Sequence, residues 1–153
     1  QFAKIEVSSS GQVIAILKKS NELILFERST NKITSLGTGI TNFIFAPDGK
    51  KIAFTLESGS LSIYGVKDGA QEEKYILEKV SVPWAGAREI LWHGDNNYLF
   101  LRDKDNKLYF VEVNDSPPTN IVEISAQVKN FTYNKEDDSL YWETPQGIWR
   151  AKL

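Results

Sequence analysis

The feature that most constrains the fold of this chain is an internal repeat. Four times, a large apolar residue precedes a short polar segment, which is followed by a run of residues typical of a β-strand. The leading residues are Val7, Phe45, Trp92 and Tyr133, at spacings of 38, 47 and 41 residues. The repeat predicts an all-β chain built from four consecutive copies of one antiparallel sheet.

The polar segment of each repeat has the composition of a tight turn. In the second repeat, Pro47 fixes φ at the first corner, Asp48 can bond to its own backbone, and Gly49 tolerates a positive φ. The residues that we place at the position of Gly49 in the other repeats are Gly11, Asn96 and Asp137. All are residue types that adopt left-handed conformations, so the same turn is predicted four times.

Further strands follow in each repeat. Third strands are predicted at 23–26, 61–64, 108–111 and 148–150, and outer strands at 33–36, 75–77 and 121–124. Segment 70–79 is rich in helix formers, so a short helix is the alternative there. Four short strands in about 40 residues are typical of β-propeller blades. We therefore expect a β-propeller fragment of four-stranded blades at about 2–39, 40–86, 87–127 and 128–153, the last blade lacking its outer strand.

Segment Phe45–Phe54, with its Pro47-Asp48-Gly49-Lys50 turn, resembles the blade motif of TolB-type, WD-repeat-like propellers. The match is close in the second repeat and partial in the others, and the Trp-Asp dipeptide of WD repeats does not occur. The resemblance implies a bacterial binding module in the periplasm, at the cell surface or secreted, or a domain beside an enzyme. It supplies no catalytic residues and no cofactor.

Composition and charge argue against several classes of function. The net charge is −2 with both signs mixed along the chain, so no basic surface for nucleic acid or an anionic membrane is expected. The sequence has no apolar run of about 20 residues, and its first residues do not predict a signal peptide. Without cysteine, it can form neither disulfides nor thiolates. A chain without methionine that begins at Gln1 is expected to be processed or part of a longer polypeptide.

The fourth repeat has no outer strand at either end of the chain, so we expect a segment upstream of Gln1 to supply one. Three arrangements stay open: the C-terminal part of a ring of about six to eight blades, two copies in an eight-bladed ring, or four blades closing alone. Because stacked repeats bury their faces only against neighbours, both end blades are expected to expose apolar faces. Upstream blades or a second copy are the expected partners.

No catalytic or metal site is predicted. His93 is the only histidine, and without a second histidine or a cysteine no common zinc set can form, so we interpret it as a turn residue. Segment 103–106 begins like a calcium loop, but the glycine and closing glutamate of that motif are missing, which favours a tight turn. Asn114 and Asn130 begin short glycosylation sequences, the second within a predicted inner strand. The interpretation is a chain that is not an enzyme and holds no cofactor.

Trp84 is the strongest candidate for a binding residue. Other aromatics fall at core positions of the repeat: Phe45, Trp92, Tyr133, Trp142 and Trp149. Trp84 lies instead in segment 80–87, which lengthens the link between the second and third blades. We predict that Trp84 and Arg88, with Arg102 and Asp103 from the adjoining hairpin turn, contact a protein or peptide. The alternative is that Trp84 packs on the neighbouring blade.

The predicted function is a non-catalytic protein-binding, peptide-binding or scaffolding module of a larger, extracytoplasmic bacterial protein, with the cytoplasm as the alternative compartment. One alternative is an accessory propeller of a hydrolase whose catalytic domain lies outside these residues. Another is a structural unit that assembles with itself into a ring of double size.

Overall fold

The structure is a computed structural model that describes residues 1–66, 86–113 and 120–153. Within these ranges the chain consists of strands and turns, and no helix is long and apolar enough to cross a membrane. The strands form four antiparallel sheets. The chain divides into two compact units, residues 1–82 and 83–153.

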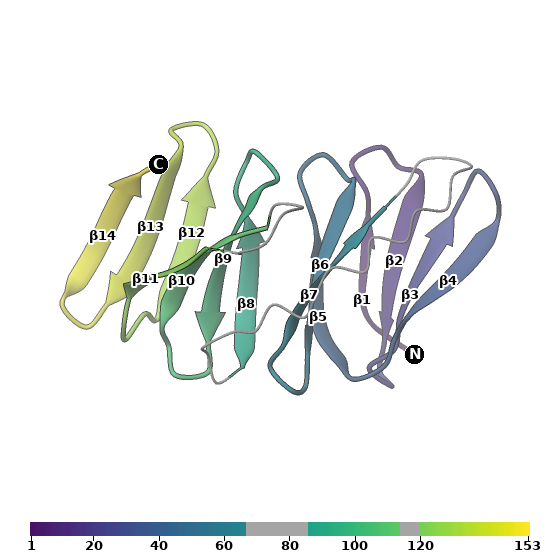
Figure 1. Cartoon of the computed structure of the whole chain (residues 1–153), viewed down its shortest axis with the longest axis horizontal. Coiled ribbons are helices and arrows are strands. Elements are labelled where there is room, and N and C mark those ends of the chain that lie inside the picture. The colour runs from purple at the N-terminus through teal and green to yellow at the C-terminus, as the bar shows by residue number, and fades with distance from the viewer. Residues whose placement is uncertain (67–85, 114–119) are drawn as a thin grey trace. The chain divides into compact units, whose positions relative to one another are not determined.

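The first unit contains two sheets whose strands are hydrogen-bonded in chain order (Figure 1). The first sheet consists of β1 (Phe2–Val7), β2 (Val13–Lys18), β3 (Leu23–Glu27) and β4 (Lys32–Gly37). The second consists of β5 (Ile40–Phe45), β6 (Lys51–Leu56) and β7 (Leu61–Gly65). The outer strand predicted at 75–77, and its helical alternative at 70–79, lie outside the described residues.

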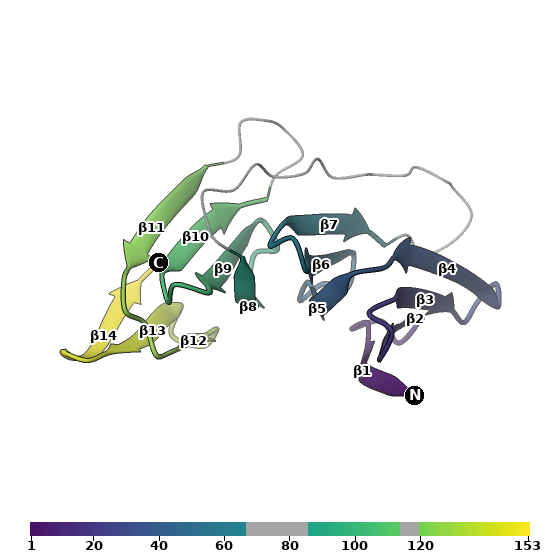
Figure 2. The same ribbon diagram turned by 90° about the horizontal axis from the view of Figure 1, so that it is seen from below.

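The second unit repeats this arrangement, and its strands also follow one another in chain order (Figure 2). The third sheet consists of β8 (Ala87–Trp92), β9 (Tyr98–Asp103), β10 (Leu108–Glu112) and β11 (Ile121–Ser125). The fourth consists of β12 (Asn130–Asn134), β13 (Ser139–Thr144) and β14 (Gly147–Lys152). The prediction of an all-β chain with antiparallel sheets in series, the last lacking an outer strand, is confirmed.

The turn between the first and second strands has the predicted form in three sheets. The N–H groups of Gly11, Gly49 and Asn96 each donate to the carbonyl three residues earlier, and these residues have φ values of 72°, 73° and 66°. In the fourth sheet the prediction of a left-handed Asp137 is wrong, because Asp138 has the positive φ of 50°. The turn there spans only 135–138, one residue fewer than 8–12, 46–50 and 93–97, so the left-handed position moves by one.

Each unit has its own apolar core. In the first, one side of the first sheet packs against one side of the second in a single cluster: Val13, Ala15, Leu17, Leu23, Leu25, Ile40, Phe43, Ile52, Phe54 and Val66. In the second, Phe100, Leu108, Val128 and Leu140 form the cluster, and Tyr133 and Trp142 pack against it. The aromatic residues that periodicity assigned to the core are buried or pack against these clusters, with one exception.

That exception is Trp149, which was predicted to be buried and is 51% exposed. It lies on β14, which pairs with β13 and with no other described strand. Its neighbour across the ladder, Trp142, packs on the core, while the indole N–H of Trp149 donates to Thr144 Oγ1 at 3.1 Å. Trp149 lies opposite Trp142 as Ser62 lies opposite Phe54, so it occupies the position of Ser62 and not that of the buried Ile63 with which it was aligned.

The prediction that both end sheets expose apolar faces is right for the first sheet only. Phe2, Ile5 and Val7 of β1 are more than half exposed. In the fourth sheet, the side opposite the core carries mainly polar side chains: Asn130, Thr132, Asn134, Tyr141, Glu143, Ile148, Arg150 and Lys152. The sequence reasoning treated the two ends as equivalent, but their composition differs.

Candidate functional site

Of the four residues predicted to bind a partner, Trp84 lies outside the described residues and Arg88 is exposed on β8. Arg88 sits at a β-bulge, because the pairing of β8 with β9 shifts register between Ala87 and Glu89. A bulge bends the strand and redirects a side chain. Within the described ranges, the Arg88 guanidinium makes neither a hydrogen bond nor an ion pair.

Arg102 is engaged within the second unit. Its guanidinium donates to the carbonyl of Val128 at 3.0 Å and to that of Lys129, and it pairs with Glu89 at 2.9 Å. Only 11% of its side chain is exposed. The structure thus gives Arg102 an intramolecular role, holding the residues that lead into β12 against the third sheet.

Asp103 is buried beneath the turn that follows β9. One carboxylate oxygen accepts the backbone N–H groups of Asp105 and Lys107, each at 2.9 Å, and the other accepts the hydroxyl of Tyr109 at 3.3 Å. Burial, followed by the charge of Asp103, raises the pKa of Tyr109 to about 12. The turn is tight, with Asn106 at a φ of 61°, as predicted in place of a calcium loop.

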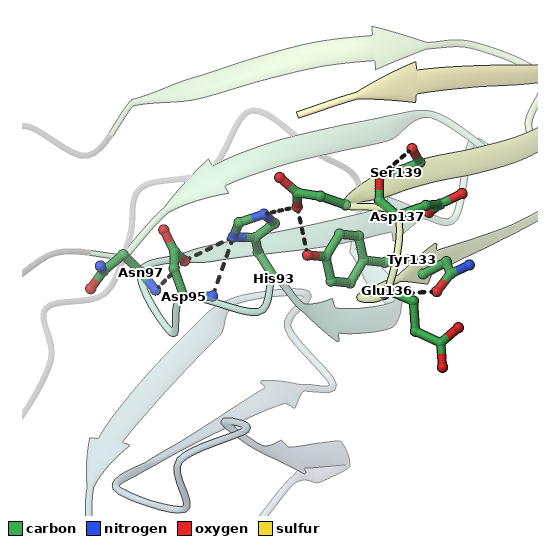
Figure 3. Close-up of polar contacts among 9 residues, drawn as sticks. His93, Asp95, Asn97, Tyr133, Glu136, Asp137 and Ser139 are labelled. Atoms are coloured by element: carbon green, nitrogen blue, oxygen red, sulfur yellow. Dashed lines mark hydrogen bonds and ion pairs between the residues drawn. The ribbon is translucent and has the colours of Figure 1, made fainter.

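A polar cluster that the sequence reasoning missed joins the first turns of the third and fourth sheets (Figure 3). His93 Nε2 lies 3.2 Å from Asp138 Oδ1, which also accepts the Tyr133 hydroxyl at 2.8 Å. His93 Nδ1 lies 2.9 Å from Asp95 Oδ1. The imidazole is therefore placed between two carboxylates, and its ring tilts against that of Tyr133 at a centroid distance of 4.9 Å.

The electrostatics of this cluster favour ionised carboxylates. The hydroxyl of Tyr133, and then His93, lower the pKa of Asp138 below its ordinary value. Burial opposes the ionisation of Asp95, but hydrogen bonds from His93 and the Asn97 backbone outweigh it and lower the pKa of that carboxyl. Burial and the hydrogen bond to Asp138 raise the pKa of Tyr133. Both imidazole nitrogens face carboxylates of the chain, which makes the cluster a link between two turns.

A signal for this cluster was present in the repeat. The first turns of the first and second sheets lie side by side, since a Cβ added at Gly49 would lie 2.7 Å from Ser9 Oγ. The same adjacency brings turn 93–97 to turn 135–138. No group of three or more His, Asp or Glu side chains that could hold a metal ion is found among the described residues.

No family model matches the chain, and no curated protein matches it. Among solved structures, it is similar to the β-propeller domain of Cps50 (Swd1) from Myceliophteria thermophila, with 12% identity and a TM-score of 0.73 over 100% of this chain and 54% of the other. A protein of Bacteroides uniformis, proposed to be a 6-phosphogluconolactonase, has 18% identity and a TM-score of 0.60 over 97% and 49%.

A third similar structure is the dihydro-heme d1 dehydrogenase NirN in complex with DHE. It shows 14% identity and a TM-score of 0.67 over 99% of this chain and 34% of that one. The chain thus spans about half the length of the first two structures and a third of NirN. Sequence identities this low carry information on architecture alone, and that information agrees with the serial antiparallel sheets: the chain has the β-propeller fold.

Proposed function

We propose that this chain is a non-catalytic, TolB-type propeller segment that binds a protein or peptide within a larger, extracytoplasmic bacterial protein. The observation that carries the proposal is the exposed Arg88 guanidinium at the bulge of β8. The neighbouring Glu89 carboxylate pairs with Arg102 and leaves the charge of Arg88 uncompensated among the described residues.

The chemistry of Arg88 defines the class of ligand. A guanidinium presents several N–H donors in a planar fork, which matches a carboxylate with two parallel hydrogen bonds. Arginine and tryptophan are the residue types enriched at the energetic centres of protein interfaces, and Trp84 precedes Arg88 closely in the sequence. The proposed ligand is therefore a peptide segment with an acidic side chain beside an apolar one.

The test uses peptides selected from a random library on the immobilised chain, with their affinity measured by calorimetry. Arg88→Ala and Trp84→Ala are each expected to weaken binding about tenfold or more, because each removes a central contact. Arg28→Ala is the matched control, since Arg28 is an exposed arginine in the other unit. Selected peptides that bind both variants as tightly as the unmodified chain would refute the site.

The second candidate function is that of an accessory propeller beside the catalytic domain of a hydrolase. The similarity to a protein proposed to be a 6-phosphogluconolactonase supports it at the level of fold. This candidate requires lactone hydrolysis by a protein that includes the chain, with the catalytic domain outside residues 1–153. Hydrolysis that is unchanged in Arg88→Ala and is lost when the domain outside these residues is removed would favour it over peptide binding.

A further inference from the structure

The side of the first sheet that faces away from the second sheet, here called the outer face, is mainly apolar, with Lys18 and Ser35 as its polar members. The strand registers place eight apolar side chains on it: Phe2, Ile5, Val7, Ile14, Ile16, Ile24, Phe26 and Ile33. Ile5 and Val7 are 53% and 54% exposed, and Ile33 is 65% exposed. An exposed apolar patch spread over four strands marks an interaction surface on a soluble protein.

The repeat allows the burial of these side chains to be compared with that of equivalent side chains in other sheets. Val7 pairs with Ile14 as Phe45 pairs with Ile52 and as Trp92 pairs with Leu99. Ile52 is completely buried within the first unit. The outer face thus carries apolar side chains at positions that the second sheet buries.

The first unit shows which kind of surface covers such positions. The opposite side of the first sheet covers Phe43, Ile52 and Phe54 of the second sheet within one apolar cluster. Two charged side chains of β1 complete this interface. Lys4 Nζ donates to the carbonyl of Phe43 at 2.5 Å, and Glu6 accepts the N–H of Phe45 at 3.3 Å.

The fourth sheet does not offer such a covering surface. At the positions of Val13, Ala15, Leu17 and Leu25 it has Ser139, Tyr141, Glu143 and Arg150. These polar groups already bind one another or nearby residues: Arg150 pairs with Asp137 at 3.4 Å and lies over the ring of Tyr141, while Lys129 pairs with Glu143 at 3.6 Å. The last sheet of a second copy is therefore a poor match for the outer face.

We propose that the outer face docks a further blade of the same propeller, a sheet that is not among residues 1–153. The interface between the first and second sheets defines the chemistry of its docking side: aliphatic and small residues at the centre, with a lysine or arginine and a carboxylate that reach the backbone of β1 at Ile5 and Val7. The chain spans about half the length of two similar propeller structures, which leaves further blades to supply this sheet. The proposal is independent of peptide binding at Arg88.

The probe for this proposal is the chain's own first sheet. Residues 1–39 are duplicated upstream and joined to Phe2, so that Phe2 follows Gly39 as Ile40 does in the chain. The added sheet then presents Lys4, Glu6 and the aliphatic side of its strands to the original outer face. Because the chain has no cysteine, Val7→Cys in the original copy gives a single site whose labelling by a thiol reagent reports exposure.

Docking predicts that labelling of Val7→Cys in the original copy is slower in the extended protein than in the unextended chain, by roughly tenfold or more. Val7→Cys placed in the added copy instead is expected to label rapidly. Thr132→Cys, on the polar side of the fourth sheet, is the control and is expected to label equally in both proteins. Adding Ile16→Lys to the original copy is expected to restore rapid labelling at Val7→Cys.

Two outcomes would overturn the proposal. One is equal labelling of Val7→Cys in the extended and unextended proteins. The other is slow labelling in the unextended chain together with a dimer in sedimentation, which would assign the outer face to a second copy.

Discussion

Gly11 and Gly49 share one backbone conformation in different surroundings. Their φ values are 72° and 73°, and both occupy the left-handed position of the first turn of a sheet. A Cβ at Gly49 would lie 2.7 Å from Ser9 Oγ and 3.1 Å from Ser9 N, whereas a Cβ at Gly11 would meet nothing within 4 Å. Comparing alanine variants of the two glycines therefore separates two losses of stability: that of a left-handed alanine, and that of crowding the neighbouring turn.

Gly11→Ala is expected to lower the free energy of unfolding of the first unit by about 1 kcal/mol, the cost of a left-handed non-glycine residue. Gly49→Ala is expected to cost about 1–2 kcal/mol more, because the Ser9 backbone must move as well. Urea unfolding of both variants measures the difference. Equal losses would show that the two turns are not held together.

Tyr109 links stability to alkaline pH. Its pKa in the folded chain is about 12, above the ordinary value of 10.0. The unfolded chain therefore releases this proton first, so the stabilisation is complete below about pH 10 and is lost as the pH rises towards 12. Tyr109→Phe is expected to flatten the fall in the free energy of unfolding over this interval, and urea unfolding at several pH values measures it. An unchanged slope would contradict the assignment.

At the scale of the elements, neighbouring sheets are joined by polar side chains as well as by apolar packing. Lys4 joins the first sheet to the backbone of β5, and Arg102 joins the third sheet to the carbonyls just before β12. In both cases the acceptor is a carbonyl of, or next to, the first strand of the following sheet. That strand has a ladder partner on one side only, so its other side is open to side-chain donors.

Arg102→Ala is expected to destabilise the second unit by about 2 kcal/mol, because the carbonyls lose a donor and Glu89 loses its partner. Arg102→Lys is expected to recover only part of this, since an ammonium lacks the planar fork that serves several acceptors. Urea unfolding followed by tryptophan fluorescence measures both. Lys107→Ala, which breaks the exposed pair with Glu123, is the control and should change little. Full stability in Arg102→Ala would contradict this role.

The strands were predictable because each carries alternating apolar residues between turn formers, a pattern visible in single repeats. The first turn of the fourth sheet was predicted wrongly, because Asp137 and Asp138 are both compatible with a positive φ. Only the shorter connection between β12 and β13 selects Asp138. The intramolecular roles of Arg102 and Asp103 depend on which backbone groups lie nearby, and spacing alone does not specify these groups. Trp149 was misplaced because its alignment with Ile63 was off by one residue, and a shift of one residue moves a side chain to the other side of a sheet.

At the scale of the whole chain, each unit has its own apolar cluster. Repeats of this kind contact only their neighbours, so loss of a core side chain is expected to act locally. Phe43→Ala, at a cost of about 3–5 kcal/mol, is expected to reduce amide protection mainly in β1–β7. Leu140→Ala, at about 2–5 kcal/mol, is expected to act mainly on β8–β14. Hydrogen exchange measures both, and a uniform loss in either variant would contradict this localisation.

The polar side of the fourth sheet also limits how the chain can aggregate. When one surface of a molecule fits a different surface of the next copy, molecules can add head to tail without limit and form filaments. Here the apolar outer face of one molecule meets ion-paired Arg150, Glu143 and their neighbours on the next, so growth by head-to-tail addition is disfavoured at its first step. Residues 1–153 with an uncovered outer face are therefore expected to stay out of filaments, because their fourth sheet presents charged side chains to that face.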